Sequence, residues 1–436
     1  MSIAQLSVVF FLQMFIILLV CRVVGWIGRK YLHQPQVVGE MVAGVILGPS
    51  LFGLLLPELQ KAVFPVETKG VLYVGAQLGV GLYMFLVGLG FRADHFKTNV
   101  KSAAAVSISG MAAPFLVAIL ITPWLMSVPG LFSESATRFN ATLFMGACIA
   151  ITAFPMLARI IHERGLSQTK LGTLSLSAGA IDDAGAWCVL AIVLASFGAG
   201  AGVAYTAIIG GILFASFMIL VAPKLLAPLA RYAEGQQTLS PTLLSIVLML
   251  FMLSAFIADA IGLHAVFGGF LLGAIMPRGK LTNEVKRQLE PFVVILLLPM
   301  FFTYSGLNTQ LTMVNNLELL AIALVILAGS IAAKGVACWG AARLCGADNR
   351  TAMGIGALMN ARGLMELIII NIGLQAGVIG PALFSMMVLM AIVTTLMASP
   401  LFEVVYGKRA REMGELEALS KDEQSHQPTP QTTSPT

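Results

Sequence analysis

The sequence predicts an all-α integral membrane protein with about 13 transmembrane helices. Of its 436 residues, 58% are hydrophobic and 11% are charged, against roughly a quarter charged in an ordinary soluble domain. Apolar runs of about 20 residues, long enough to cross a hydrocarbon core of ~30 Å as helix, recur along the chain. We therefore expect one transmembrane domain over residues 1–406 and exclude a water-soluble protein.

Polar breaks divide the apolar sequence into candidate spans. These cover residues 6–27, 36–56, 70–91, 102–126, 140–161, 171–197, 203–223, 241–260, 263–277, 291–308, 317–342, 351–375 and 380–406. The weakest division lies within residues 241–277, where only residues 259–263 separate two runs. Residues 407–436 are rich in Ser, Thr, Gln and Pro, a composition too polar to bury a core, which predicts a disordered cytoplasmic tail.

Basic residues indicate the orientation in the membrane. Most of the 26 Lys and Arg residues fall in alternate loops, and Lys and Arg concentrate in cytoplasmic loops. This pattern predicts an N-terminus outside and a C-terminus in the cytoplasm. Taken with the length of the polar tail, this topology favours a bacterial inner membrane. The net charge of +5 thus marks topology and predicts no nucleic-acid partner. The five cysteines are scattered, without a Cys-x-x-Cys pair, and indicate no redox role, bound metal or cofactor.

Few ionisable side chains lie inside the predicted spans. A charge at the centre of a spanning helix costs on the order of 2.5–3.5 kcal/mol, so each is a functional candidate. Those well inside spans are Glu40, Asp182, Asp183, Lys334, Arg362 and Glu366. For Glu40, which follows Gly39 and precedes Gly44, we expect a role in packing or gating.

Asp182 and Asp183 lie midway along the span 171–197 among small residues. A carboxylate can coordinate a dehydrated monovalent cation or accept a proton, and competition between the two at one group produces antiport. Adjacent helical residues point about 100° apart, so we expect the two aspartates to differ in role. The alternative is that neighbouring helices satisfy both acids and the pair only stabilises the bundle. That alternative is stronger for Asp182, because Lys334 is available as an ion-pair partner.

Lys334 lies in the middle of the span 317–342. Two interpretations stay open from the sequence. A buried amine can act as a proton carrier, or it can be the structural partner of a carboxylate.

Two spans are predicted to be discontinuous. The segment Thr-Ala-Phe-Pro-Met-Leu-Ala-Arg from Thr152 places Pro155 in mid-helix, where it frees a backbone carbonyl, although an ordinary kink is the alternative. The segment Asn-Ala-Arg-Gly-Leu-Met-Glu-Leu from Asn360 supplies a second polar break, with Asn360, Arg362, Gly363 and Glu366. Transporter sites often form where such broken helices cross. The two spans are seven apart, so they run in opposite directions, as in an inverted repeat.

These segments, together with Gln-Pro-x-Val-Val-Gly-Glu-Met from Gln34, resemble the monovalent cation:proton antiporter family. The branch in question contains bacterial Na⁺/H⁺ and K⁺/H⁺ antiporters, glutathione-gated potassium efflux systems and plant cation/H⁺ exchangers. The resemblance covers about residues 5–406. It implies a homodimer in which a core domain, built from inverted repeats with two crossed discontinuous helices, moves against a dimerisation domain in an elevator-like cycle.

The resemblance also implies roles for individual residues. Asp183 would bind the monovalent metal cation and the proton, Asp182 would lie beside it and pair with Lys334, and Thr152 would lie near the crossing. A double aspartate with the lysine accompanies electrogenic exchange in the family. Gly90 stands where many relatives have an acidic residue, so no role is carried over there.

The sequence therefore favours a secondary active antiporter, not an enzyme, that exchanges Na⁺, and Li⁺ as well, for H⁺ and serves pH homeostasis. K⁺/H⁺ exchange is the closest alternative, because oxygen ligands do not reveal ion size in a sequence. A cation channel and a non-transporting receptor are alternatives of other classes. An intramembrane aspartyl protease needs two aspartates on different helices, which adjacent residues do not provide. The expected partners are membrane lipid, a second copy of the chain, monovalent cations and protons.

Overall fold

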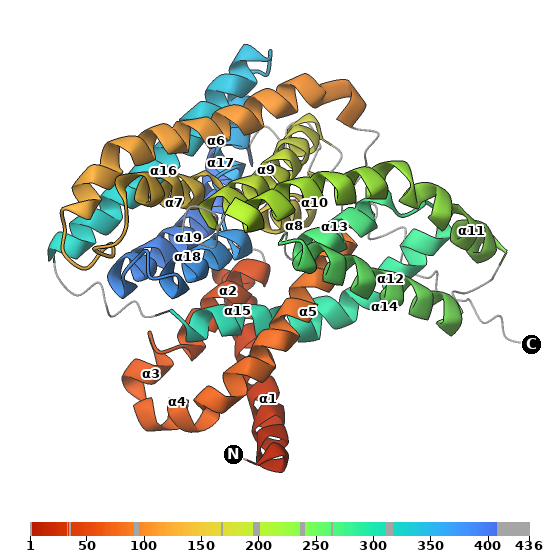
Figure 1. Cartoon of the computed structure of the whole chain (residues 1–436), viewed down its shortest axis with the longest axis horizontal. Coiled ribbons are helices and arrows are strands. Elements are labelled where there is room, and N and C mark those ends of the chain that lie inside the picture. The colour runs from red at the N-terminus through yellow and green to blue at the C-terminus, as the bar shows by residue number, and fades with distance from the viewer. Residues whose placement is uncertain are drawn as a thin grey trace, which may run out of the picture.

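The computed structural model describes residues 2–32, 34, 36–90, 96–166, 169–194, 201–235, 240–262, 265–309 and 317–407. These residues are almost entirely helical, and the one β-interaction among them is an isolated bridge between Phe132 and Ile379. Nine helices in the described part are individually long and apolar enough to cross a membrane. The protein is an all-α integral membrane protein, as predicted (Figure 1).

The first half of the chain supplies eleven helices. They are α1 (Ile3–Leu32), α2 (Gln36–Leu47), α3 (Phe52–Leu55), α4 (Pro57–Val63), α5 (Val66–Gly90), α6 (Phe96–Met126), α7 (Arg138–Ala150), α8 (Phe154–Glu163), α9 (Lys170–Leu194), α10 (Ala201–Leu220) and α11 (Ala222–Glu234).

The second half supplies eight further helices and two π-helical turns. They are α12 (Pro241–Ala260), α13 (Ala265–Ile275), α14 (Lys280–Phe292), η3 (Val293–Leu297), α15 (Leu298–Leu307), α16 (Leu317–Leu344), α17 (Asn349–Leu358), α18 (Leu364–Gln375), α19 (Pro381–Phe402) and η5 (Glu403–Gly407). Every predicted span coincides with a helix or with a pair of consecutive helices. The weak division within residues 241–277 is real: α12 ends there, and Gly262 adopts a φ of +86°, which favours glycine.

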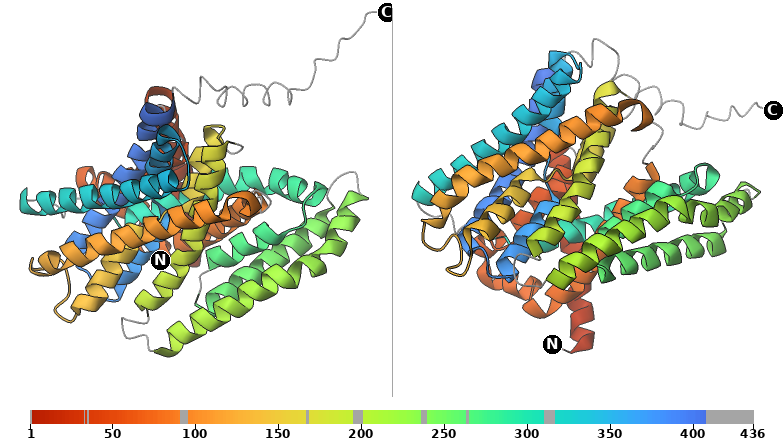
Figure 2. Two further views of the ribbon diagram at one scale, coloured as in Figure 1. Left: turned by 90° about the horizontal axis from the view of Figure 1, so that it is seen from above. Right: turned by 45° about the horizontal axis from the view of Figure 1, so that its top comes forward.

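The helices pack into two groups (Figures 1 and 2). In the core group, α6 packs on α7, α9 and α16, while α16 also packs on α17 and α19. In the outer group, α2 packs on α1 and α15, and α13 packs on α5 and α12. Direct contacts between the groups are sparser and include those of α2 with α19 and of α5 with α8. The described fold thus has a core group and an outer group that share a limited interface.

Packing within the two halves of the chain follows one pattern, with the first six spans matched by the last six. The contact of α1 with α2 corresponds to that of α12 with α13, and the contact of α6 with α7 corresponds to that of α16 with α17. Likewise, α2 on α15 corresponds to α13 on α5. Matched spans are seven apart and therefore run in opposite directions. The inverted repeat predicted from the two broken spans is confirmed by this packing.

The structure places Pro155 differently from the prediction. Helix α7 ends at Ala150, and Pro155 is the second residue of α8 instead of a mid-helix residue. The first turn of a helix has unpaired N–H groups in any case, so a proline without an N–H costs little there. The side chain of Pro155 lies outside the described residues. The predicted tail 407–436 also lies outside them, except for Gly407.

Candidate functional site

The two broken helices meet at their non-helical segments. Residues 151–153 separate α7 from α8, and residues 359–363 separate α17 from α18. Ala153 N donates to Ala361 O at 3.1 Å, which joins the two segments directly. The discontinuous helices therefore cross at their breaks inside the core group.

Gly363 allows this close approach. A Cβ atom at this position would lie 2.8 Å from Met156 Cγ and 3.3 Å from Ala153 Cβ. These separations are shorter than an ordinary contact between carbon atoms, so a larger residue would push the second break away from the first.

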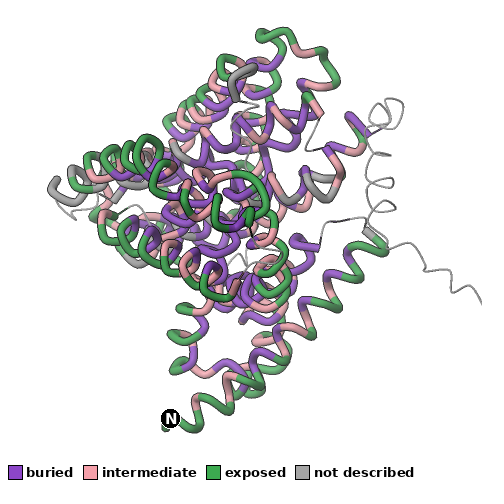
Figure 3. Tube along the Cα trace, turned by 90° about the vertical axis from the view of Figure 1, so that its right-hand side faces the viewer, coloured by how far each residue is buried: buried purple, intermediate pink, exposed green. Residues whose placement is uncertain are grey.

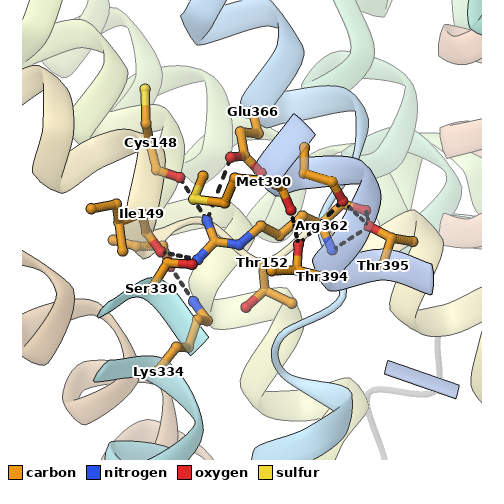
Figure 4. A network of polar contacts seen from close by, with 12 residues as sticks. Cys148, Ile149, Thr152, Ser330, Lys334, Arg362, Glu366, Met390, Thr394 and Thr395 are labelled. Carbon is orange, nitrogen blue, oxygen red and sulfur yellow. Dashed lines mark hydrogen bonds and ion pairs between the residues drawn. The ribbon is translucent and has the colours of Figure 1, made fainter. Parts of the chain in front are cut away.

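Two buried basic side chains close the C-terminal end of α7. The last carbonyl groups of a helix have no partner within it and carry partial negative charge. Arg362 donates to Cys148 O and to Ile149 O, both at 2.7 Å, and Lys334 Nζ donates to Ala150 O. Figure 4 shows Arg362 and Lys334 converging on these carbonyls. The half-helix end is thus satisfied by charged side chains from α16 and from the second break.

Asp182, on α9, is saturated with hydrogen-bond donors. Its Oδ1 accepts from Ser107 Oγ at 2.6 Å, and its Oδ2 accepts from Lys334 Nζ at 2.8 Å. Both partners of this ion pair are 0% exposed. The hydroxyl of Thr152 lies 2.8 Å from Asp182 Oδ2 and 3.0 Å from Met359 O, so it links the aspartate to the crossing. Sequence reasoning predicted this pairing of Asp182 with Lys334.

Asp183 has a different environment although it is the next residue. It is 2% exposed, and its Oδ1 has no hydrogen-bond partner within the described part of the chain. Asn360 shows a related pattern, since its Nδ2 donates to Gly356 O at 2.9 Å while its Oδ1 is buried without a partner. Most buried polar atoms in proteins are hydrogen-bonded. Both oxygens are therefore available to coordinate a cation, and the carboxylate oxygen of Asp183 can also take a proton.

Arg362 and Glu366 form a looser pair one turn apart. Arg362 Nη1 lies 3.6 Å from Glu366 Oε1, and neither carboxylate oxygen of Glu366 has a hydrogen bond among the described residues. Thr395 of α19 holds the backbone of Arg362: its Oγ1 accepts from Arg362 N at 3.2 Å and lies 2.8 Å from Arg362 O.

The buried charges around the crossing do not cancel. Among the described residues, Lys334 and Arg362 are basic, while Asp182, Asp183 and Glu366 are acidic. With all five ionised, the site carries one excess negative charge. One bound monovalent cation or one bound proton neutralises this charge. Because burying an uncompensated charge is costly, the site is more stable with a cation or a proton bound than empty.

The structure brings together most residues that the sequence singled out. Thr152 and Lys334 both contact Asp182, and Arg362 shares the end of α7 with Lys334. Sequence reasoning missed Ser107 and Thr395. Hydroxyl side chains are common in spanning helices because they can bond to their own backbone, so these two carried no signal.

Comparison with known proteins agrees with this geometry. A family model described as "Sodium/hydrogen exchanger, transmembrane" matches residues 5–405. The Na⁺/H⁺ antiporter NhaS4 of Synechocystis is 39% identical over 399 residues, which cover 90% of this chain and 95% of that protein. The K⁺/H⁺ antiporter 1 of Saccharomyces cerevisiae is 32% identical; the match covers 92% of this chain but 47% of the yeast protein, so this chain spans about half of its length.

A solved structure shares the fold. The sodium proton antiporter MjNhaP1 from Methanocaldococcus jannaschii superposes with a TM-score of 0.57 at 14% identity, over 90% of this chain and 95% of that one. At this identity the likeness concerns the fold alone, and it matches the arrangement of helices described above. With the family match over nearly the whole chain, it leads to one conclusion: the chain belongs to the sodium/hydrogen exchanger family, a family of membrane cation/proton antiporters and not of enzymes.

Proposed function

We propose that this protein is a Na⁺/H⁺ antiporter that binds Na⁺, and Li⁺ as well, or a proton at Asp183. The observation that carries the proposal is the contrast between two adjacent buried acids. Asp182 is saturated by three donors, whereas Asp183 keeps a buried oxygen without a partner. An ion that arrives at Asp183 Oδ1 therefore displaces no hydrogen bond from that oxygen.

The excess charge accounts for the coupling. A site with one excess negative charge is neutral with one Na⁺ or with one proton, and not with both. Moving the site across the membrane while it is ionised and empty is costly, because its charge would pass through a low-dielectric interior. The site therefore moves more readily with a cation or a proton bound. Cation and proton then travel in opposite directions in alternate halves of one cycle.

Electrogenic exchange needs a second proton for each cation. Lys334 is the candidate carrier, because its ammonium group is held by Asp182 and by the carbonyl of Ala150. When a cation recruits Asp182 as an additional ligand, the ion pair opens and Lys334 can release its proton. In this electrogenic variant the cation-loaded site carries one net negative charge whereas the proton-loaded site is neutral, so each cycle moves charge across the membrane. In the alternative, Lys334 stays paired throughout, has only a structural role, and the exchange is electroneutral.

The two helix groups suit an elevator-like cycle. Contacts that link them are few and separable: Phe154 meets Phe270 edge-on at 5.4 Å between ring centroids, and Gln34 Nε2 donates to Leu396 O at 3.2 Å. In the proposed cycle the core group carries the site past the outer group. The outer group is held in a homodimer in a bacterial plasma membrane, with the N-terminus outside and the polar tail in the cytoplasm.

K⁺/H⁺ exchange is the second candidate. The yeast relative is named a K⁺/H⁺ antiporter, and a Bacillus cereus relative that is 26% identical over 404 residues is named an Na⁺/H⁺-K⁺ antiporter. Oxygen ligands from a carboxylate, an amide and a hydroxyl can serve either cation.

Proteoliposomes with an imposed pH gradient test these assignments together. We expect both Na⁺ and Li⁺ to dissipate the pH gradient. If exchange is electrogenic, dissipation is faster with the membrane potential clamped, because the potential that builds up otherwise opposes further exchange. Dissipation by K⁺ but not by Na⁺ would replace the sodium assignment. Cation flux that ignores the pH gradient would indicate a channel, and absence of any flux would indicate a receptor.

A further inference from the structure

Several helices of the core group end together where η5 ends. Leu171 of α9, Ala342 of α16 and Tyr406 of η5 belong to one hydrophobic cluster. A Cβ atom on Gly354 of α17 would lie 2.6 Å from Leu171 Cδ1 and 3.4 Å from Tyr406 Cβ, so α9, α17 and η5 meet there. In Figure 3 the uppermost stretch of the tube, where α16 turns into α17, is coloured as exposed. We call this region the end face; its exposed residues include Lys101, Lys170, Arg343, Leu344, Cys345, Arg350 and Val404.

The end face is cationic. Lys101, Lys170 and Arg350 are exposed, and none of the three makes a hydrogen bond or an ion pair within the part of the chain that the structure describes. Arg343 is partly engaged, because its Nη1 donates to Ala347 O at 2.7 Å. These side chains therefore offer positive charge to an anionic partner.

The acids at this end have other partners. Asp348 caps α17, where it accepts a hydrogen bond from Thr351 N at 3.3 Å. Glu403 forms an ion pair with Arg164, with 3.3 Å between Oε2 and Nη1. Neither carboxylate is recorded with a contact to Lys101, Lys170 or Arg350, so the positive charge of these three is not compensated locally.

Apolar side chains lie among these cations. Leu344 is 91% exposed at the end of α16, and Val404 is 81% exposed in η5. A simple inorganic anion would leave both uncovered. A surface that combines cations with exposed aliphatic groups instead fits a peptide that has acidic and apolar side chains.

The continuation of the chain has this composition. Residues 412–423 read Glu-Met-Gly-Glu-Leu-Glu-Ala-Leu-Ser-Lys-Asp-Glu, with five acids and one lysine. Met413, Leu416 and Leu419 recur at every third position, a spacing that places apolar side chains on one side of a helix. Residues 424–436 contain no Asp, Glu, Lys or Arg, so the negative charge of the tail is confined to this segment.

The segment also begins close to the end face. Tyr406 is 3% exposed, which fixes the point where the chain leaves η5. Only residues 408–411 separate Gly407 from Glu412. An extended chain advances at most about 3.6 Å per residue, so Glu412 lies within about 18 Å of Gly407. A short tether of this kind gives the segment a high effective concentration at the end face.

We propose that the acidic segment 412–423 docks on the end face of its own chain. Its carboxylates pair with Lys101, Lys170 and Arg350, and its apolar side chains cover Leu344 and Val404. Such a segment has too little apolar surface to fold alone and orders on the surface that it binds. The end face lies outside the ion site, so docking is measured without reference to transport.

Disulfide cross-linking in the full-length protein tests the proposal. Cys345 is exposed on the end face, whereas Cys21, Cys148 and Cys338 are buried, so Cys345 is a native reporter. Ala418→Cys adds a thiol to the segment with little change in size. In nanodiscs of phosphatidylcholine with a mild oxidant, we expect a disulfide between residues 345 and 418 of one chain, identified by peptide mass spectrometry. Cys345→Ser should abolish it.

Charge variants separate docking from mere proximity on a short tether. Lys170→Gln with Arg350→Gln should slow the cross-linking of Ala418→Cys about fivefold, because exposed ion pairs contribute modestly and two are lost together. Lys224→Gln with Arg231→Gln removes two exposed cations from α11 and should leave the rate unchanged. A concentrated salt solution should slow cross-linking of the unmodified surface as well.

Charge exchange separates lost docking from a disturbed fold. Lys170→Glu with Arg350→Glu should slow cross-linking, and adding Glu415→Lys with Glu417→Lys should restore it. Equal rates in the two glutamine pairs, or no recovery on charge exchange, overturns the proposal. A disulfide found only between two copies of the chain also overturns it. So does loss of the cross-link when phosphatidylglycerol replaces phosphatidylcholine, because the cations of the end face would then bind lipid headgroups.

Discussion

The two broken helices occupy equivalent places in the inverted repeat, yet they contribute different chemistry. The first break, residues 151–153, has no charge; it supplies Thr152 and, just before it, the end carbonyls of α7. The second break, residues 359–363, supplies Arg362, with Glu366 one turn later. The first half of the chain thus presents the partial negative charge of the end carbonyls of α7, and the second half presents the Arg362 guanidinium group that compensates it.

The next spanning helix after each broken helix, α9 in the first half and α19 in the second, shows the same contrast. In the first half, α9 contacts its break through Asp182, which lies 2.8 Å from the hydroxyl of Thr152. In the second half, α19 contacts its break through Thr395, which holds the backbone of Arg362. The geometry is repeated, but only the first half carries an acid there. A symmetric scaffold therefore supports an asymmetric ion site, and we expect substitutions in the two halves to have different consequences.

The largest effect on exchange is expected for Asp183→Asn. The amide keeps the size of the side chain but cannot alternate between charged and protonated forms. We expect sodium-driven dissipation of a pH gradient in proteoliposomes to fall to the level of empty liposomes. The melting temperature should change little, because Asp183 Oδ1 has no hydrogen bond to lose on substitution. An active Asp183→Asn protein would place the exchange site elsewhere.

The largest effect on stability is expected for Lys334→Ala. This change leaves Asp182 buried without its ion-pair partner, and breaking such a pair from one side costs about 3–5 kcal/mol. Thermal unfolding in detergent measures the loss, and the double variant Lys334→Ala with Asp182→Asn should recover part of it.

The same double variant sharpens the assignment of Lys334. If the lysine carries the second proton, exchange by the double variant becomes insensitive to a clamped membrane potential. If exchange remains electrogenic, Lys334 has only a structural role. If the double variant is no more stable than Lys334→Ala alone, the loss of stability in Lys334→Ala does not come from the broken ion pair with Asp182.

The smallest effects come from a matched pair of threonines, Thr152→Val and Thr395→Val. Each removes hydroxyl contacts worth about 1 kcal/mol. We expect Thr152→Val to raise the sodium concentration needed for half-maximal exchange, because its hydroxyl contacts Asp182. We expect Thr395→Val to lower the melting temperature without changing that concentration. Identical shifts in both variants would argue against the asymmetry of the two halves.

Much of the fold and of the candidate site was predictable for a simple physical reason. Charged residues in apolar spans are rare and costly, so Asp182, Asp183 and Lys334 stand out without any coordinates. Ser107 and Thr395 did not stand out, because their hydroxyl side chains resemble those of many other small residues in spanning helices. The predicted position of the first break was also wrong by a few residues: the sequence placed it at Pro155, and the structure has it at residues 151–153. A proline occurs both in mid-helix kinks and in the first turn of a helix, so its position alone does not locate the break.

By itself the sequence determined the number of spans, the polar breaks in two of them, and the short set of ionisable residues that the membrane must tolerate. Hydrophobic length and charge are local properties, readable along the chain. The resemblance to the family implied that Asp182 pairs with Lys334. Only the tertiary structure decided that Ser107 and Thr152 also hold Asp182, while Asp183 Oδ1 has no hydrogen bond among the described residues. Ser107 and Lys334 are 75 and 152 residues from Asp182 in the chain. Packing of α6 against α9, and of α16 against α6, brings their donors to one of two adjacent carboxylates.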